Sequence, residues 1–477
     1  MTTIKSTQNV SSKDNLILIG TAKSDFAKQG LSKAEADFVN KQIKAEEHII
    51  NINQYERRIL IYIAEDKKNE NYTLEAFRKA GNKACGVFNA AKAEQVTLVD
   101  LTGNAEQILA FAEGMALGNY QFIQLKKDAK KLAHSLKTIL IHSKKVTAKE
   151  IQNLQIVVDA TEKARTLVNL PLNYLNAVQL AKEFEKMGKE AGFKVEVLNK
   201  ARIEALKMGG LIAVNLGSID PPTFTIMEYK PKNAVNKKPY MLVGKGVVYD
   251  TGGLSLKPTA GMADMKCDMG GAATVGCTMY AIAKAGLPVW VVGLTPATDN
   301  RPGGNAYTNG DILTMHDGST VEMLNADAEG RLILADALSY GKKYNPELAI
   351  DLATLTGAAA AAIGKYGIVA MGTAGKNEFD ALKHSGEKVN ERLVEFPMWE
   401  EYGDLLKTEI ADMKNIGGPV AGAITAGKFL EKFTSYPWIH LDIAGPAFLD
   451  SAYDYKTKGG TGVGVRLLFD FLSNVKK

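Results

Sequence analysis

Hydrophobic positions in the first third of the chain form short runs separated by helical patterns. Apolar runs rich in β-branched residues predict strands at 15–20, 57–64, 96–101 and 137–143. Between these runs, residues 72–91 and 105–118 place apolar side chains at intervals of three and four, which predicts helices. The alternation is typical of an α/β domain, which we expect to occupy residues 1–146.

A long helix is expected to follow this domain. Thr147 and Glu150 have the spacing of a capping box and precede a helical pattern that Pro171 ends. We therefore predict a connecting helix at 147–170, and a larger catalytic domain at 171–477.

The remaining sequence alternates in the same way. Nearly continuous apolar runs predict strands at 240–249, 289–296, 348–357, 368–373 and 439–445. Residues 270–286 and 330–344 predict helices between them. Strands of this kind are covered on both faces, so we expect a mixed, mostly parallel sheet flanked by helices.

Charged residues gather where these strands end and helices begin, which is where open α/β sheets bind ligands. They are Lys245, Asp250, Lys257, Asp268, Asp327, Glu329 and Arg331. Each has a structural alternative, because an aspartate often caps a turn or a helix and a glutamate is favoured in a first helical turn. Four carboxylates brought together, however, repel one another and bind protons or cations. The cluster is a candidate site for two divalent metal ions, which carboxylates bridge well.

Composition limits the class of protein without naming a function. The 477 residues are 46% hydrophobic and 23% charged, typical of a globular protein with two domains. The polar start lacks a secretory signal, and no run of about 18 apolar residues occurs, so we expect a cytoplasmic protein without a membrane partner. Cys85, Cys267 and Cys277 do not form a metal-binding motif, and we interpret them as structural thiols.

Positive charge is concentrated in the N-terminal part. Residues 1–150 hold 23 Lys and Arg against 17 Asp and Glu, whereas the remainder holds 35 against 36. The run KKDAKK at 126–131 contributes to this excess. It is most simply a solvated surface, but it leaves open an alternative function, a nucleic-acid-binding oligomer that uses the basic N-terminal half.

Motifs of other functional classes are absent from this sequence or have the wrong spacing. The GKG at 244–246 lacks the spacing of a phosphate-binding loop, and the glycine run at 459–464 lies too near the end for a dinucleotide-binding unit. The sequence has neither an HExxH motif nor a GxSxG elbow. A different two-metal hydrolase, such as a phosphoesterase, would favour several arginines as phosphate clamps, and only Arg331 lies in the cluster.

Two stretches, VGKGVVYDTGGLSLKPTAGMADMKCDMGGAA at 243–273 and LNADAEGRLILADAL at 324–338, resemble the signatures of the leucyl aminopeptidases, or cytosol aminopeptidases, of peptidase family M17. Further similar segments cover essentially the whole chain. The resemblance implies two-metal-dependent hydrolysis of the N-terminal peptide bond, with release of leucine and other apolar residues from peptides with a free N-terminus. It also implies a homohexamer, a dimer of trimers.

The resemblance assigns a role to each clustered residue. Lys245, Asp250, Asp268 and Glu329 would bind one metal, and Asp250, Asp327 and Glu329 the second. The family's ions are typically Zn²⁺, with Mn²⁺, Co²⁺ or Mg²⁺ exchangeable at the weaker position. Lys257 would stabilise the tetrahedral oxyanion, and Arg331 would hold a bicarbonate that acts as general base. The implied substrate-binding residues are Met265, Asn325, Thr354, Leu355 and Gly357.

The sequence also departs from the family pattern. Position 326 is Ala where Thr is usual. A hydrogen bond that supports the metal loop, the segment that carries Asp327 and Glu329, is therefore expected to be lost while the ligands remain. Residues 315–317, Met-His-Asp, and the pair Gly303 and Gly304 differ as well. They precede the metal loop, and we expect them to change the shape of the pocket.

Overall fold

The computed structural model describes residues 2–65 and 67–475. Its chain divides into two compact units. Unit 1 comprises Met1–Glu162 and Ser451–Lys458, and unit 2 comprises Lys163–Asp450 and Gly459–Lys477. The first division, between Glu162 and Lys163, lies within helix α5 (Ala148–Asn169). This helix occupies the range predicted for the connecting helix, 147–170. Thr147 and Glu150 exchange the two hydrogen bonds of a capping box at its start, at 2.8 and 3.2 Å.

Unit 1 contains a six-stranded sheet in the order β1-β6-β5-β2-β4-β3. Only β3 runs antiparallel to its neighbour, β4. The strands are β1 (Thr3–Ser6), β2 (Leu16–Gly20), β3 (Ile49–Asn53), β4 (Arg58–Ile63), β5 (Gln95–Asp100) and β6 (Thr138–His142). The four predicted strands correspond to β2, β4, β5 and β6. The polar start, which carried no strand signal, adds β1 at the edge of the sheet beside β6.

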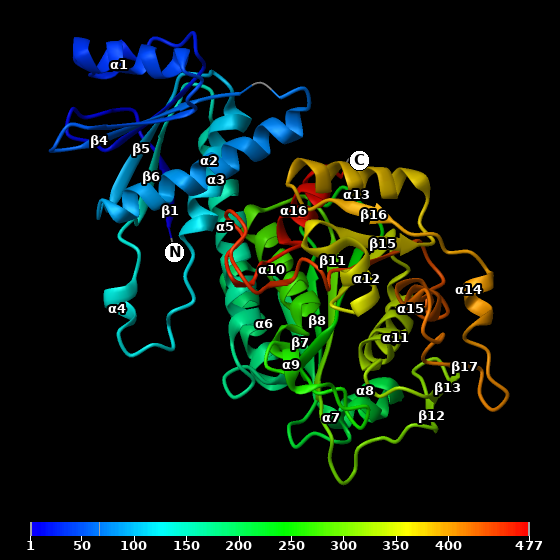
Figure 1. Ribbon diagram of the computed structural model, residues 1–477. Coiled ribbons are helices and arrows are strands. Elements are labelled where there is room, and N and C mark those ends of the chain that lie inside the picture. Colours follow the sequence, from blue (N-terminus) through cyan, green and yellow to red (C-terminus); the bar gives the residue numbers. More distant parts are fainter. Residues whose placement is uncertain (1, 66, 476–477) are drawn as a thin grey trace. The chain divides into compact units, whose positions relative to one another are not determined.

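Helices cover both faces of this sheet (Figure 1). They are α1 (Lys33–Lys44), α2 (Glu70–Ala90), α3 (Ala105–Asn119) and the first part of α5. The short helix α4 (Ala129–Leu132), which has no buried residue, lies in a segment that extends away from the sheet. Alternate residues of β2 enter different cores, because successive side chains of a strand point to opposite faces. Ile17 and Ile19 join the core formed with α2 and α3, while Leu16 and Leu18 join the core that contains Val39 of α1.

Residues 451–458, far along the chain, also belong to unit 1. Tyr455 is buried there, and its hydroxyl donates to Glu75 Oε2 at 2.9 Å. Lys79 forms an ion pair with Asp454 at 3.2 Å. A short segment of the C-terminal half is therefore fixed against α2.

Unit 2 contains a nine-stranded sheet. Its strands are β7 (Lys194–Leu198), β8 (Thr223–Tyr229), β9 (Tyr240–Gly244), β10 (Gly246–Asp250), β11 (Val291–Asn300), β14 (Leu348–Ala353), β15 (Ile368–Gly372), β16 (Leu393–Glu395) and β18 (Trp438–Asp442). The order is β16-β15-β18-β14-β9-β11-β8-β7, and β10 pairs separately with β11. The central strands β18, β14, β9 and β11 are parallel, so their carboxyl ends share one edge of the sheet.

Two groups of helices sandwich this sheet (Figure 1). One group contains α6 (Ala177–Ala191), α10 (Gly270–Ala285) and α16 (Val465–Ser473), and the other α8 (Gly209–Asn215), α11 (Glu329–Gly341) and α15 (Gly422–Glu431). Further α-helices of unit 2 are α7 (Lys200–Ala205), α9 (Thr259–Met262), α12 (Gly357–Ile363), α13 (Lys376–Lys388) and α14 (Glu401–Asp404). Small sheets add β12 (Asp311–Thr314), β13 (Thr320–Met323) and β17 (Met413–Lys414), and β19 (Phe448–Leu449) with β20 (Gly459–Gly460). The predicted α/β fold class is confirmed for both units.

The strand expected at 240–249 is in fact two strands. Lys245 separates β9 from β10, and its backbone bonds in two directions: its N–H donates to the carbonyl of Leu352 at 3.0 Å, and its carbonyl accepts from the N–H of Ala272 at 2.9 Å. The apolar pattern continues through the break because the residues on both sides are buried. The break places the Lys245 side chain at the carboxyl edge of the central strands.

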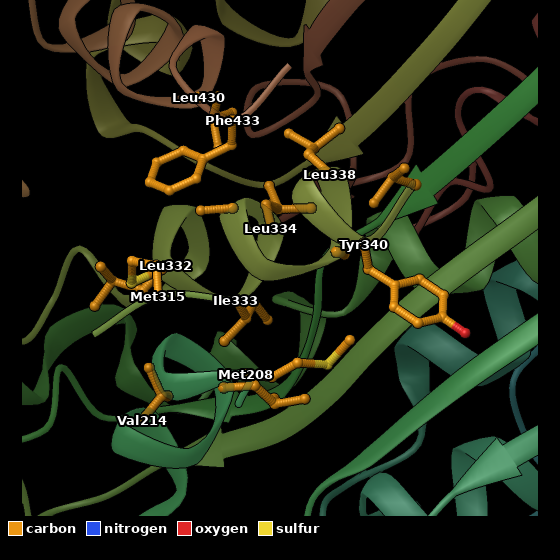
Figure 2. Close-up of a cluster of buried hydrophobic side chains, with 14 of the residues drawn as sticks. Met208, Val214, Met315, Leu332, Ile333, Leu334, Leu338, Tyr340, Leu430 and Phe433 are labelled. Carbon is orange, nitrogen blue, oxygen red and sulfur yellow. The ribbon is translucent and has the colours of Figure 1, made fainter. Parts of the chain in front are cut away.

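Helix α11 is surrounded by a large cluster of buried hydrophobic side chains (Figure 2). Leu332, Ile333, Leu334 and Leu338 of this helix lie beside Met208, Val214, Met315, Leu430 and Phe433 from other elements. Side chains packed at this density have little freedom to shift. The first turn of α11, which carries Glu329 and Arg331, is therefore firmly held.

Glu391, in the loop after α13, binds the start of α16. Its carboxylate accepts the backbone N–H groups of Gly464 and Leu467, at 2.9 and 3.3 Å, and the Nε–H of Arg466 at 3.2 Å. All of these groups are buried. An acid at this end of a helix satisfies its free N–H groups and complements the helix dipole.

We expect Glu391→Ala to destabilise the protein by about 3 kcal/mol, because buried donors lose their acceptor. Calorimetry would show this as a lower Tm. Glu395→Ala is the matched control, since Glu395 pairs with Lys383 with its side chain nearly half exposed and should cost less than about 1 kcal/mol. Equal Tm values for the two variants would contradict the assigned role.

In the part of the chain that the structure describes, every helix is too short or too polar to cross a lipid bilayer.

Candidate metal centre and active site

Lys245 lies at the centre of a buried acidic group. Its side chain is 4% exposed, and its Nζ lies 2.8 Å from Asp268 Oδ1, 3.0 Å from Glu329 Oε1 and 3.0 Å from the carbonyl oxygen of Thr354. Burial alone lowers the pKa of this lysine, but attraction by Asp268, Glu329 and Asp250 raises it above the usual range. A side chain at Gly330 would collide with it, because a Cβ there would lie 2.4 Å from Lys245 Cε.

Asp250 ends β10 and is also buried. Its Oδ1 accepts the N–H of Gly252 at 2.8 Å and the side-chain amide of Asn300 at 2.9 Å. Its Oδ2 lies 2.8 Å from Lys257 Nζ, which also contacts Asp327. Burial lowers the pKa of Lys257, but these two carboxylates raise it above the normal value, so the side chain is a cation near neutral pH.

Asp268 follows the 3₁₀ helix Met265–Cys267 and precedes α10. Besides Lys245, it contacts the hydroxyl of Thr354, which donates to its Oδ1 at 2.7 Å. Burial raises the pKa of Asp268 well above its usual value; the charge of Lys245 opposes this, and the charges of Glu329 and Asp250 add to it. Asp268 thus contacts the same lysine as Glu329 and lies among other negatively charged carboxylates.

Asp327 and Glu329 stand at the entrance to α11. One carboxylate oxygen from each of Asp250, Asp327 and Glu329 lies within 4.8 Å of the others. Glu329 is 1% exposed, and its Oε2 is buried without a hydrogen-bond partner among the described residues. A buried carboxylate oxygen without a donor is costly unless a cation satisfies it. This oxygen set suits a divalent metal ion.

Arg331 lies two residues after Glu329, in the same first turn of α11. Its Nη1 donates to the backbone carbonyl of Asn415 at 2.8 Å, whereas its Nε is buried without a partner among the described residues. Burial lowers the pKa of its guanidinium to about 10, and Glu329 and Asp442 oppose that shift. The residue therefore offers a positive group with an unused donor, which suits a small anion.

The segment after β14 carries three of the predicted substrate-binding residues. Thr354 contacts Asp268, and the Leu355 N–H donates to Asp442 Oδ1 at 3.2 Å. Gly357 begins α12, and the position of a Cβ on it faces open space. This segment lies directly beside the acidic cluster, as its predicted role requires.

The other two predicted substrate-binding residues are placed differently. Asn325 precedes the metal loop, and its Oδ1 accepts the N–H of Asp327 at 2.9 Å, so the side chain shapes the turn that presents Asp327. Met265 is half-buried, and its carbonyl accepts the N–H of Asp268 at 3.3 Å. The described contacts give neither side chain a direct substrate role.

Three residues that hold the site together were not singled out by the sequence analysis. Asn300 ends β11 and bonds to Asp250 and to the carbonyl of Ala326. Asn415, fully buried, accepts the N–H groups of Leu324 and Asn325 and donates to the Asn325 carbonyl. Asp442 ends β18 and bonds to Leu355 and to the Thr356 hydroxyl at 2.7 Å. The sequence pattern marked none of the three: Asn300 lies beyond the strand predicted at 289–296, Asp442 lies inside the one predicted at 439–445, and Asn415 follows a strand of two residues.

The structure also places the departures from the family pattern. The backbone at Ala326 has three partners: its N–H donates to Ser255 Oγ at 3.0 Å, and its carbonyl accepts from Asn300 and from the Tyr307 hydroxyl, both at 2.9 Å. The metal loop is thus well supported at an alanine. His316 bonds to Ser339 and Asp336 on α11, away from the acids.

Comparison with known proteins agrees with this geometry. The family model described as "Cytosol aminopeptidase family, catalytic domain" matches residues 162–469, and the corresponding N-terminal domain model matches residues 66–129. The chain belongs to the cytosol aminopeptidase family. This aminopeptidase is thus a metallo-exopeptidase that releases N-terminal amino acids, and the sequence-based prediction of family and activity is confirmed. The family implies divalent metal ions.

Relatives of this aminopeptidase span most of its length. A probable cytosol aminopeptidase of Chlorobium limicola is 48% identical over 378 residues, covering 76% of this chain and 74% of the relative. One from an Azoarcus species is 43% identical over 418 residues, covering 85% and 82%.

Two solved structures share the fold. A mutant of tomato leucine aminopeptidase superposes with a TM-score of 0.87 at 27% identity, covering 100% of this chain and 97% of that one. The bottromycin maturation enzyme BotP, in complex with Mn, gives a TM-score of 0.86 at 28% identity, covering 97% and 99%.

Proposed function

We propose that this aminopeptidase uses two divalent cations held by the clustered acids. Lys245, Asp250, Asp268 and Glu329 would hold one ion, and Asp250, Asp327 and Glu329 the other, so Asp250 and Glu329 would be shared. The observation that carries the proposal is the convergence of three carboxylates within 4.8 Å around the unpartnered, buried Glu329 Oε2. We propose Zn²⁺ as the usual ion, with Mn²⁺, Co²⁺ or Mg²⁺ at the weaker position.

The cations, when bound, supply Lewis acidity that polarises the scissile carbonyl and lowers the pKa of the attacking water. The chain's own groups handle the remaining charge and protons. The Lys257 ammonium, fixed between Asp250 and Asp327, donates to the oxygen that becomes negative in the transition state. The unpartnered Nε–H of Arg331 would hold a bicarbonate ion, which would supply general-base chemistry at the site.

The substrate is a peptide with a free N-terminus. A terminal amine offers a lone pair to the cation site, whereas an internal bond or an acylated terminus does not. Leu355 and Gly357 supply backbone groups to orient the peptide, while Asn325 and Thr354 keep Asp327 and Asp268 in place. Met265 would line the side-chain pocket, where a thioether favours leucine and other apolar residues.

Removing the metal should abolish the reaction. We expect the purified protein to release leucine from leucyl anilide with added Zn²⁺ or Mn²⁺, to lose this activity in a chelator, and to regain it when metal is restored. Acetyl-leucyl anilide is the matched control, because it keeps the bond and loses the amine. Activity that survives chelation, or equal turnover of both substrates, would contradict the proposal, as would a content of one metal ion per chain at saturation.

The cellular setting remains a proposal too. The relatives carry the name cytosol aminopeptidase, which supports a cytoplasmic location, and we propose the family's homohexamer as the assembled form.

The nucleic-acid alternative rests on charge alone. Lys126, Lys127, Lys130 and Lys131 are exposed around α4, and only Lys131 is near an acid among the ion pairs described, at 3.9 Å from Asp128.

A gel-retardation assay would test that alternative. DNA retardation that persists in Glu329→Ala but is lost when these four lysines are replaced would favour it.

A further inference from the structure

Asn300 occupies an unusual position between two loops that carry proposed metal ligands. It is the last residue of β11 and is fully buried. Its single Nδ2 lies 2.9 Å from Asp250 Oδ1 on one side and 2.9 Å from the Ala326 carbonyl on the other. One amide group therefore joins the end of β10 to the loop before α11.

The chemistry of the neighbours fixes the orientation of this amide. A carboxylate and a carbonyl only accept hydrogen bonds, so the NH₂ group must face both of them. The Asn300 Oδ1 is then left buried without a partner among the described residues. An unsatisfied buried oxygen costs on the order of 1–3 kcal/mol. This cost argues that the residue serves more than packing, since an apolar side chain of similar size would avoid it.

The surrounding backbone is shaped to accept the amide. Gly253 adopts a φ of +61°, and a Cβ there would lie 2.7 Å from Asn300 Oδ1 and 3.1 Å from the Cβ of Ala326. The Asn300 carbonyl also accepts from Thr251, from its N–H at 3.0 Å and from its hydroxyl at 2.9 Å. Asn300 thus contacts the turn after Asp250 through both its side chain and its main chain.

We propose that Asn300 is a positioning residue of the metal centre, which holds the Asp250 carboxylate at a fixed separation from Asp327 and Glu329. This inference rests on the proposed metal-binding function. A neutral amide suits the role because it orients a carboxylate without adding positive charge that would oppose cation binding. Side chains that orient metal ligands typically contribute 10-fold to 100-fold in metal affinity.

The test compares two buried asparagines, Asn300 at the end of β11 and Asn215, which contacts the same strand. Asn215 donates its Nδ2 to the hydroxyl of Thr298 in β11 at 3.1 Å and to the carbonyl of Asp220 at 2.8 Å, and neither of these belongs to the ligand loops. Metal-free full-length protein is titrated with Mn²⁺ by calorimetry, and Tm is measured without metal. We expect Asn300→Ala to weaken Mn²⁺ binding about 10-fold to 100-fold, and Asn215→Ala to lower Tm while its Mn²⁺ affinity stays within about twofold of wild type.

The Mn²⁺ affinities of these variants separate the positioning role of Asn300 from the metal-binding function itself. Wild-type affinity in Asn300→Ala, or an equal loss in Asn215→Ala, would overturn the positioning role while leaving the metal site intact. If wild type binds no Mn²⁺, or Glu329→Ala binds it equally well, the proposed function fails and this inference fails with it. Should Asn300→Ala not fold, Asn300→Ser, which keeps one donor, replaces it, and a measurable loss of affinity is again required.

Discussion

Glu329→Ala is expected to reduce kcat/KM for leucyl anilide by at least roughly 10³-fold, even with saturating Mn²⁺ or Zn²⁺. Glu329 is one of the two acids proposed to be shared by both cation positions, and it contacts Lys245 at 3.0 Å. A metal ion contributes several kcal/mol to transition-state stabilisation, and each 1.36 kcal/mol corresponds to a factor of ten. The same substitution should lower the bound metal below the two ions per chain that we propose, as measured by elemental analysis.

The control must separate loss of chemistry from loss of folding. Glu329→Gln keeps the shape of the side chain and removes its charge, so it should lose activity while its circular dichroism spectrum stays unchanged. Glu347→Ala makes the same change as the first variant at an exposed position and should retain full activity. Normal turnover in Glu329→Gln would show that the carboxylate is not a ligand.

Lys257→Ala is expected to lower kcat by about 10²-fold to 10³-fold, the usual effect of removing a donor to an oxyanion. The metal content should remain two ions per chain, because Lys257 is not among the proposed ligands and its removal leaves Asp250 and Asp327 free to bind cations. KM should change little if the ammonium acts mainly in the transition state. Steady-state kinetics on leucyl anilide and elemental analysis of the same sample would measure both quantities.

Comparison with an exposed lysine makes this result specific. Lys284 on α10 lies 3.3 Å from the carbonyl of Glu190, outside the site, and Lys284→Ala should behave as wild type. A raised KM with unchanged kcat in Lys257→Ala would indicate ordinary substrate binding instead. Loss of one metal ion would mean that Lys257 maintains the ligand geometry.

The metal contents of Glu329→Ala and Lys257→Ala, compared with each other, show whether the two side chains have separate roles. Lys257 Nζ lies 2.8 Å from Asp250 Oδ2, and Glu329 has a carboxylate oxygen within 4.8 Å of one from Asp250, so both side chains adjoin the same acid. If both variants lose metal, the cluster behaves as one electrostatic unit. If only Glu329→Ala loses metal, ion binding and oxyanion stabilisation are separate tasks of neighbouring side chains.

Several features follow from local sequence alone. The apolar runs correctly located β2, β4, β5 and β6, and the capping box at Thr147 and Glu150 located the start of α5. The four carboxylates Asp250, Asp268, Asp327 and Glu329 were singled out because each stands where a strand ends or a helix begins, and such positions are marked by neighbouring residues. The sequence also indicated the burial of Lys245, because it lies within an apolar run.

Other features required the tertiary structure. The break between β9 and β10 depends on hydrogen bonds to Leu352 and Ala272, so the apolar pattern of 240–249 does not reveal it. The inclusion of residues 451–458 in unit 1 depends on the contact between Tyr455 and Glu75, which are 380 positions apart. Local periodicity reports which side chains are buried, but it does not report which distant element covers them.

The candidate site likewise combines features that the sequence predicts with features that only the tertiary structure decides. Residue types and their positions at strand ends determined that Lys245, Asp250, Asp268, Asp327 and Glu329 are candidates for one cluster. Only the fold determined that Asn300 and Asn415 connect the loops that carry them, because these hydrogen bonds join residues 26 to 91 positions apart. An asparagine's role depends on which acceptors surround its amide, and that arrangement exists only once the central strands and α11 have packed together.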